Sequence, residues 1–231
     1  MKKTRINKNV KQDMRGREPD WWRPEDKEYW KLWKESLKQR QEIERRIDKR
    51  VNLIADVGSG QGRLLSLVPK TDAMVFLDIS EKMVREASCN VKRKGIDNSY
   101  FIVGDAENIP LKESVADIAI CLQTLIHVPN REKCLGELSR IMKEDGTLVV
   151  DIPIHNLIDY TYWSLRHGGV KNFLVDVMRK VGILKSYSSP VTRKEFYGVC
   201  EESELSIADE FKIGPWNTFI LKKKDKDYAV L

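Results

Sequence analysis

The sequence predicts an α/β fold in which a doubly wound, mostly parallel sheet ends in an antiparallel strand. Two observations support this prediction. Between residues 51 and 152, short apolar runs alternate with helical segments, a pattern typical of parallel strands joined by right-handed crossovers. Near the C-terminal end, the strand-like runs 205–213 and 216–222 are separated only by Gly214 and Pro215. Because so short a link reverses the chain, we expect these two strands to pair antiparallel.

The first fifty residues differ in charge from the rest of the chain. Residues 1–50 hold 17 Lys or Arg and 10 Asp or Glu, whereas the other residues hold 24 and 25. Segment 1–17 is basic with few apolar positions, so we expect a mobile, solvated arm. Contact with an anionic partner, such as RNA or lipid headgroups, is the alternative. We therefore divide the chain into a basic arm with a helix, 1–50, and a binding domain, 51–231.

Length, hydropathy and cysteine spacing exclude several classes of protein. The 231 residues suit one domain. No apolar run approaches the roughly 18 residues of a membrane-spanning helix, and the basic start leads into no apolar signal segment. The four cysteines show no C-x-x-C spacing, which predicts reduced thiols in a cytoplasmic protein.

The first predicted helix runs from about residue 25 to residue 48. Pro24, Glu25 and Asp26 suit a first helical turn. Apolar side chains recur at helical spacing, and the early ones are aromatic: Tyr29, Trp30, Trp33, Leu37, Ile43 and Ile47. We expect this helix to pack on the core by its aromatic face.

A strand followed by a glycine-rich turn opens the predicted sheet. Residues 51–57 are β-branched and apolar, and three glycines follow on alternate positions: Gly58, Gly60 and Gly62. The apolar positions within 64–68 then predict a helix. Because glycine permits φ > 0 and close backbone approach, main-chain N–H groups at this turn can contact a ligand. The dinucleotide fingerprint would need glycine at Arg63, which disfavours a pyrophosphate ligand.

Four further strands follow before residue 153, at 73–78, 100–103, 117–122 and 147–152. Ser80 can cap the helix after the second strand, and Gly95 can end it. Another helix is predicted at 131–142, followed by a turn at Asp145 and Gly146. Residues 154–190 then interrupt the alternation of strands and helices with a long, apolar-rich helical stretch, as expected of an insertion that covers a substrate. A capping box from Thr192 to Glu195 predicts the last helix.

Acidic residues stand where the first three strands end. Asp56 precedes the glycine turn, Asp78 ends the second strand, and Asp105 follows the third. In an open α/β sheet the ligand lies outside the carboxyl ends of the strands, and buried strands rarely finish on unpaired acids. The sequence therefore predicts a binding site where these three acids meet at one edge of the sheet.

The segment from Asp56 to Gly62 matches the pattern [DE]-x-G-x-G-x-G, and with the two later acids it resembles the class I S-adenosylmethionine (SAM)-dependent methyltransferases. The resemblance covers about residues 50–153 by motif and the last two strands by topology. It implies a Rossmann-like fold, SAM as the cofactor and methyl transfer as the reaction. That family often places an N-terminal helix across the mouth of the site, so the aromatic helix is a possible lid.

The resemblance also implies a role for each acid. Asp78 would accept hydrogen bonds from both ribose hydroxyls, and Asp105 from the exocyclic amine of adenine. Asp56 would orient the turn and the methionine ammonium. Other implied cofactor contacts come from the turn, the helix after the second strand and the segment after the fourth: Gly58, Ser59, Gly60, Gly62, Ile79, Met83, Ala106, Leu122 and Gln123. If this edge bound no ligand, Asp78 would be a helix-capping acid, and Asp105 would be a turn residue whose side chain hydrogen-bonds its own backbone.

Candidate catalytic groups are few. His127 matches a histidine common in the resembled family, and an imidazole there could accept a proton from the substrate; bridging backbone groups is the alternative role. We expect Cys121 to be a buried thiol rather than a nucleophile. No His, Cys and carboxylate cluster has metal-ligand spacing, so no metal is expected.

The sequence therefore predicts a SAM-dependent methyltransferase that acts on an O, N or C atom of a small or medium organic acceptor. The aromatic helix and the apolar insertion favour a partly hydrophobic acceptor. An RNA, such as a tRNA, is the alternative because of the basic residues in 1–50. A nicotinamide oxidoreductase and a non-catalytic SAM-binding protein are the other classes considered.

Overall fold

Seven strands and four helices make up the part of the chain that the computed structural model describes, residues 27–46, 51–64, 71–95, 97–154, 191–214 and 216–224, with side chains from residue 34 onwards in the first range. The strands are β1 Val51–Val57, β2 Thr71–Asp78, β3 Ser99–Val103, β4 Ala116–Cys121, β5 Met142–Ile152, β6 Leu205–Ile213 and β7 Trp216–Lys223. The helices are α2 Lys27–Arg46, α3 Glu81–Arg93, α4 Arg131–Ile141 and α6 Arg193–Glu202.

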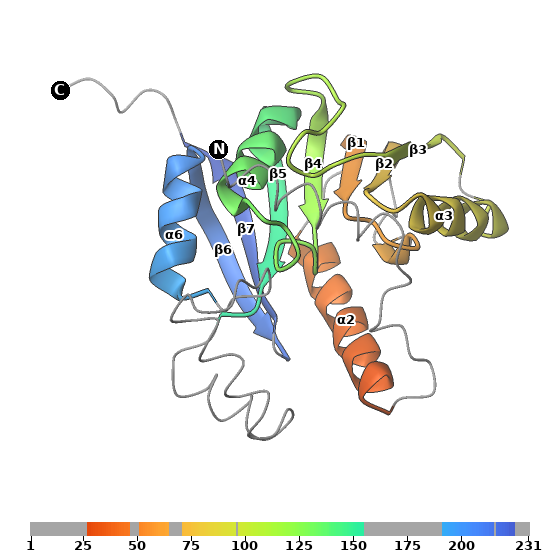
Figure 1. Ribbon diagram of the computed structural model, residues 1–231, viewed down its shortest axis with the longest axis horizontal. Coiled ribbons are helices and arrows are strands. Elements are labelled where there is room, and N and C mark those ends of the chain that lie inside the picture. The colour runs from red at the N-terminus through yellow and green to blue at the C-terminus, as the bar shows by residue number, and fades with distance from the viewer. Residues whose placement is uncertain are drawn as a thin grey trace, which may run out of the picture.

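The strands form one sheet in the order β3-β2-β1-β4-β5-β7-β6 (Figure 1). The pairs from β3 to β5 are parallel, and β7 runs antiparallel to both of its neighbours. The predicted doubly wound sheet with a reversed last strand is therefore confirmed. The order reverses between β1 and β4, and this switch point is where such sheets bind their ligands.

Capping side chains begin three of the helices. Ser80 Oγ accepts from the Met83 N–H at 3.4 Å, and Asn130 Oδ1 accepts from the Lys133 N–H at 2.9 Å. The predicted capping box is present at the start of α6, where Thr192 and Glu195 satisfy each other's backbone N–H groups. These caps fix where α3, α4 and α6 begin.

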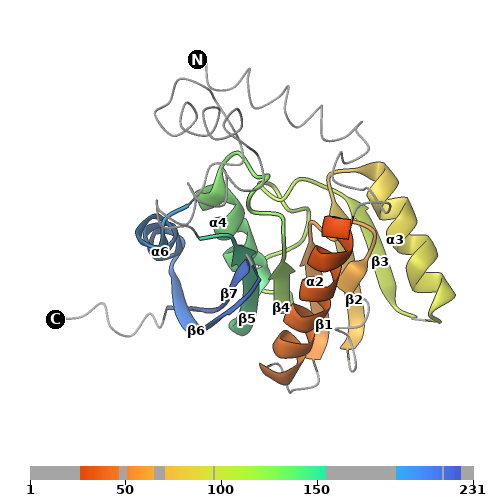
Figure 2. The same cartoon turned by 90° about the horizontal axis from the view of Figure 1, so that it is seen from below.

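The two faces of the sheet are covered by different helices (Figure 2). Helices α4 and α6 cover one face with an apolar cluster that includes Leu135, Leu138 and Phe196. On the other face, Ile43 of α2 and Val91 of α3 join a second cluster with Ile54 and Ile120 of the sheet. Because side chains alternate along a strand, Asp56 points to the same face as Ile54, toward α2.

Strand β5 begins earlier than predicted, at Met142. Its pairing with β4 passes from Ala116–Met142 directly to Ile118–Thr147, so residues 143–146 stand out of register. The expected turn at Asp145 and Gly146 is thus a break within one strand. The arm 1–17, all but the first residue of the insertion predicted at 154–190 and most of the helix after the glycine turn lie outside the described residues.

Candidate cofactor-binding site

The turn after β1 is held against two neighbouring elements. The N–H groups of Gly58 and Ser59 both donate to the Leu77 carbonyl oxygen, at 2.7 and 3.0 Å. Gly58 has a φ of 76°, and a Cβ at this position would lie 2.1 Å from Thr124 Oγ1. Glycine is therefore required here by its left-handed backbone and by the close approach of the segment after β4.

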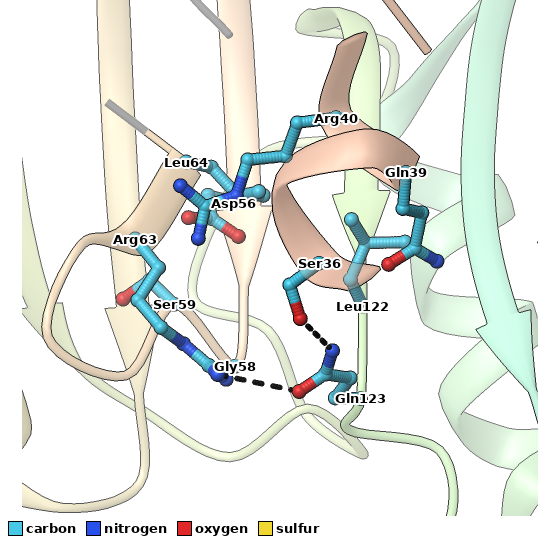
Figure 3. Close-up of a pocket in the computed structure, with 10 residues that line it drawn as sticks. All are labelled: Ser36, Gln39, Arg40, Asp56, Gly58, Ser59, Arg63, Leu64, Leu122 and Gln123. Carbon is cyan, nitrogen blue, oxygen red and sulfur yellow. Dashed lines mark hydrogen bonds between the residues drawn. The ribbon is translucent and has the colours of Figure 1, made fainter. Parts of the chain in front are cut away.

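A pocket lies between this turn and α2 (Figure 3). It encloses about 340 Å³ of empty space, part of it open to solvent. Its lining comes from α2, from β1 and its turn, and from the segment after β4: Ser36, Gln39, Arg40, Asp56, Gly58, Ser59, Arg63, Leu64, Leu122 and Gln123. Five of these residues had been predicted from the sequence: Asp56, Gly58, Ser59, Leu122 and Gln123.

Two polar atoms in this pocket are buried without a hydrogen-bond partner among the described residues: Asp56 Oδ2 and Ser59 Oγ. Burial raises the pKa of Asp56 to about 7, although the charges of Arg63 and Arg40 pull it down. Burial likewise lowers the pKa of Arg40 to about 10, with Arg63 adding to the effect. An unpaired buried acceptor is costly, so these two atoms indicate a place for a ligand that carries hydrogen-bond donors.

The three predicted acids lie near the carboxyl ends of three adjacent strands: Asp56 within β1, Asp78 at the end of β2 and Asp105 just after β3. Asp56 lies opposite Phe76, and Asp78 lies opposite Val103, so the acids step outward from β1 to β3. Asp78 also contributes to the raised pKa of Asp56. Asp56 and Asp78 therefore interact at this edge, with Asp56 deepest and only 1% exposed, whereas neither Asp78 nor Asp105 lines the pocket.

Asp78 and Asp105 differ from Asp56 because backbone groups bind them. Asp78 Oδ2 accepts from the Gly60 N–H and its Oδ1 from the Ser80 N–H, both at 2.9 Å. Asp105 Oδ1 accepts from the Glu107 N–H at 2.9 Å, which is the turn geometry considered as an alternative above. Burial raises the pKa of Asp78, and the bonds from Ser80 and Gly60 oppose this shift. A carboxylate has about four acceptor positions, so Asp78 keeps capacity for further donors.

The other predicted residues lie around this edge. Gly60 and Gly62 have φ values of 53° and 73°. Ile79 and Ala106 are half-buried after β2 and β3, whereas Met83 of α3 is buried. His127 is half-buried in the segment after β4 and does not line the described pocket. Burial lowers its pKa.

Sequence reasoning had offered the first helix as a possible lid, but it missed the polar side chains that α2 brings to the pocket, and it missed Arg63. Arg63 had been noted only for excluding a dinucleotide fingerprint, and the predicted helix had been judged by its aromatic side chains. Ser36, Gln39 and Arg40 are nevertheless only 1–6% exposed. Polar side chains on a helix are seldom buried, and the burial of these three is visible only in the structure.

The sheet order, the glycine turn and the acids at its edge define a class I methyltransferase fold. A family model described as a methyltransferase domain matches residues 48–165. The chain belongs to this family, the SAM-dependent methyltransferases, and SAM is its cofactor.

Two curated relatives match the middle of the chain. The uncharacterized methyltransferase YcgJ of Bacillus subtilis is 32% identical over 100 residues, 42% of this chain and 40% of the relative. The ubiquinone/menaquinone biosynthesis C-methyltransferase UbiE of Hydrogenovibrio crunogenus is 31% identical over 104 residues, which cover 43% of this chain and 41% of the relative. The matched part thus spans about two fifths of these relatives.

Among solved structures, magnesium protoporphyrin IX methyltransferase (ChlM) from Synechocystis PCC 6803 with bound SAH has a similar fold. It is 16% identical, with a TM-score of 0.66, over 96% of this chain and 100% of that chain. Within the described ranges, no helix combines the length and apolar character needed to cross a bilayer. No three His, Cys, Asp or Glu side chains of these ranges lie close enough together to hold a metal ion.

Proposed function

We propose that this chain transfers the methyl group of SAM to an O, N or C atom of a small or medium organic acceptor. The observation that carries the cofactor site is the pair of buried, unpartnered atoms Asp56 Oδ2 and Ser59 Oγ in a pocket that also contains Arg40 and Arg63. The amino-acid end of SAM has a positively charged ammonium and a negatively charged carboxylate. This pocket contains an acid, Asp56, and two guanidinium groups, those of Arg40 and Arg63.

The residues would divide the cofactor between them. Asp56 and Ser59 suit the ammonium, and the guanidinium groups of Arg40 and Arg63 suit the carboxylate. The free acceptor positions of Asp78 suit the ribose hydroxyls. Asp105 and Ala106 are proposed for the adenine, with Ile79 and Met83 packing against it.

The chemistry needs little more than position. SAM supplies an activated methyl group on its sulfonium, and the chain holds donor and acceptor in line while α2 covers the pocket and excludes water. His127 is the candidate base, because a lowered pKa keeps its imidazole neutral and able to accept a proton. The division into an arm, 1–50, a methyltransferase domain, 51–231, and a substrate-covering insertion, about 154–190, is part of this proposal.

A small-molecule acceptor is favoured by the relatives. UbiE is named for ubiquinone and menaquinone biosynthesis, and ChlM for magnesium protoporphyrin IX. Both names indicate organic molecules with large apolar parts. Transfer of tritiated methyl groups from SAM to a panel of quinols and phenols, with total tRNA as the comparison, would test this class. Labelling of tRNA alone, with a steep salt dependence, would contradict it.

The cofactor assignment is tested by calorimetric titration of SAH into wild type and two matched variants. Asp78→Ala removes an acid from the carboxyl edge of the sheet. Asp117→Ala removes an acid at the opposite edge, which likewise accepts from two backbone N–H groups, those of Asn52 and Leu53. We expect Asp78→Ala to abolish binding and Asp117→Ala to retain it. Retained affinity in Asp78→Ala, with its fold intact by circular dichroism, would contradict the assignment.

A further inference from the structure

Helix α2 forms the outer wall of the proposed cofactor pocket, and a buried polar contact fixes it to the sheet. Gln39 Nε2 donates to Asp151 Oδ2 on β5 and to Thr218 Oγ1 on β7, both at 2.8 Å. Gln39 is 1% exposed, and Asp151 and Thr218 are fully buried. Gln39 is 112 and 179 residues from these partners in sequence, so the contact forms only when α2, β5 and β7 are assembled.

The second oxygen of Asp151 holds the opposite wall of the same pocket. Asp151 Oδ1 accepts from the backbone N–H of Gln123. Gln123 has a φ of 54°, a left-handed conformation that a residue with a side chain adopts only when its surroundings impose it. The Gln123 side chain then donates to Ser36 Oγ of α2 at 2.9 Å and accepts from Arg63 at 3.3 Å (Figure 3).

Attaching a helix to a sheet through a buried acid costs free energy, because the carboxylate loses its contact with water. Apolar side chains of similar volume commonly give equal or greater stability, and the neighbouring residue of the same face, Val149, is apolar. Burial raises the pKa of Asp151 to about 6, and the bonds from Gln123 and Gln39 oppose this shift. A fully bonded polar group nevertheless specifies a single arrangement of the elements that it joins.

We propose that Asp151 is a positioning residue for the cofactor: its two carboxylate oxygens hold α2 and the segment 122–124 in the relative position that gives the pocket its shape. The inference rests on the proposed function, because it assumes that SAM occupies this pocket. Asp151 itself does not line the pocket, so it acts through Gln39 and Gln123.

An exchange of groups between Gln39 and Asp151 tests the proposal. Gln39→Glu places a second carboxylate against Asp151 Oδ2, so this contact between helix and sheet loses its amide donor, and only the Thr218 hydroxyl can still donate across it. Adding Asp151→Asn restores it, because the new amide on β5 can donate to the new carboxylate on α2 while its oxygen still accepts from Gln123. We expect Q39E to weaken SAH binding about tenfold or more, and the double variant Q39E/D151N to return to within about threefold of wild type.

Two further variants separate positioning from general stability. Arg46→Ala removes another attachment of α2, the 2.6 Å bond from Arg46 Nε to Asp209 on β6, which lies outside the pocket. Gln39→Met keeps the volume of the side chain and removes its donor, and it serves if Q39E fails to fold. We expect R46A to bind SAH within about twofold of wild type, and Q39M to lose affinity about tenfold with a urea midpoint close to that of R46A.

The outcomes distinguish this inference from the function on which it rests. If wild type binds no SAH, the proposed function fails, and the inference fails with it. If wild type binds SAH and the Gln39 variants bind equally well, only the inference is overturned. It is also overturned if R46A and Q39M lose affinity in the same proportion as stability, or if folded Q39E/D151N fails to recover binding.

Discussion

The two faces of the sheet are built differently. The face under α4 and α6 is filled with apolar side chains and buried thiols, among them Cys121 and Cys134. The face under α2 also has an apolar cluster, but it buries Gln39, Arg40, Asp56, Asp151 and Thr218. One face therefore supplies stability through transfer of apolar area, whereas the other carries polar groups that cost stability unless they are bonded.

The difference indicates where function is concentrated in this fold. On the α2 face, Asp151 is satisfied by the protein itself, whereas Asp56 Oδ2 and Ser59 Oγ have no hydrogen-bond partner among the described residues. Perturbed pKa values gather at functional sites, and both acids with values raised to about 6 and 7 lie on this face. Stability and cofactor affinity should therefore respond separately to substitutions on the two faces.

The largest effect on stability is expected on the apolar face. Leu138 of α4 is fully buried, and Leu138→Ala should lower the free energy of unfolding by about 2 to 5 kcal/mol, because it removes apolar contacts and leaves a cavity. SAH affinity below the unfolding transition should stay within about twofold of wild type. Urea denaturation and calorimetry check the two quantities, and a large loss of affinity would remove the distinction between the faces.

Asp56→Asn should have the opposite profile. The variant keeps the side-chain volume and loses the negative charge, so we expect SAH affinity to fall about tenfold to a hundredfold. Stability of the free protein at pH 8 should be equal or higher, since a charged carboxylate is no longer buried. Asp117→Asn, at the opposite edge of the sheet, is the matched control. An Asp56→Asn protein that is less stable but binds SAH normally would contradict the assignment of Asp56.

The pH dependence of stability should sharpen the same contrast. The pKa of Asp56 is about 7 in the folded chain, against a usual value of 3.8, so the folded protein keeps a proton that the unfolded chain releases. This carboxyl contributes stability that is fully present below pH 3.8 and is lost as pH rises through about 7. Its loss amounts to on the order of 1 kcal/mol per pH unit within that window.

The prediction is measured as a difference, because His127, whose pKa is lowered, acts in the opposite direction. Urea denaturation of wild type and Asp56→Asn between pH 5 and 8 should show the wild type losing stability relative to the variant as pH rises. Parallel curves for the two proteins would mean that Asp56 is already ionised throughout this range.

The smallest effect is expected at the edge of the polar network. Ser36 Oγ accepts from Gln123 Nε2, and Ser36→Ala should weaken SAH binding about threefold to tenfold, the equivalent of one neutral hydrogen bond. Lys38→Ala, at an exposed position of the same helix, should leave affinity unchanged. Equal losses of SAH affinity in the two variants would show that the hydrogen bond from Gln123 to Ser36 makes no contribution of its own to binding.

Local patterns in the sequence sufficed for most of the fold. Strands β1 and β6 and the helix start at Thr192 follow from runs of apolar residues and from capping chemistry, which depend on neighbours in the sequence. The placement of Asp56, Asp78 and Asp105 at one edge of the sheet also follows, because parallel strands end on the same side; only Asp56 of the three lines the pocket. The break in β5 was missed, since it depends on pairing between Ala116 and Met142.

The pocket could be predicted only in part. Asp56 and Gln123 were identified by their places at the ends of strands, and the same logic could have singled out Asp151, an acid near the end of the buried run 147–152. Its hydrogen bond with Gln39 could not be predicted, because the two residues are 112 positions apart in sequence. The glycine at position 58 was attributed to φ > 0 or a close backbone approach, and its φ is 76°; that the close neighbour is Thr124 could not be predicted, because the two residues meet only in the folded chain.

A crystal structure of the protein with SAH tests the central claim most directly. We expect the amino group of SAH to lie within hydrogen-bond distance of Asp56 Oδ2 or Ser59 Oγ, with its carboxylate toward Arg40 and Arg63 and its ribose against Asp78. An SAH molecule bound elsewhere, or one that leaves the pocket between α2 and the turn after β1 empty, would contradict the account.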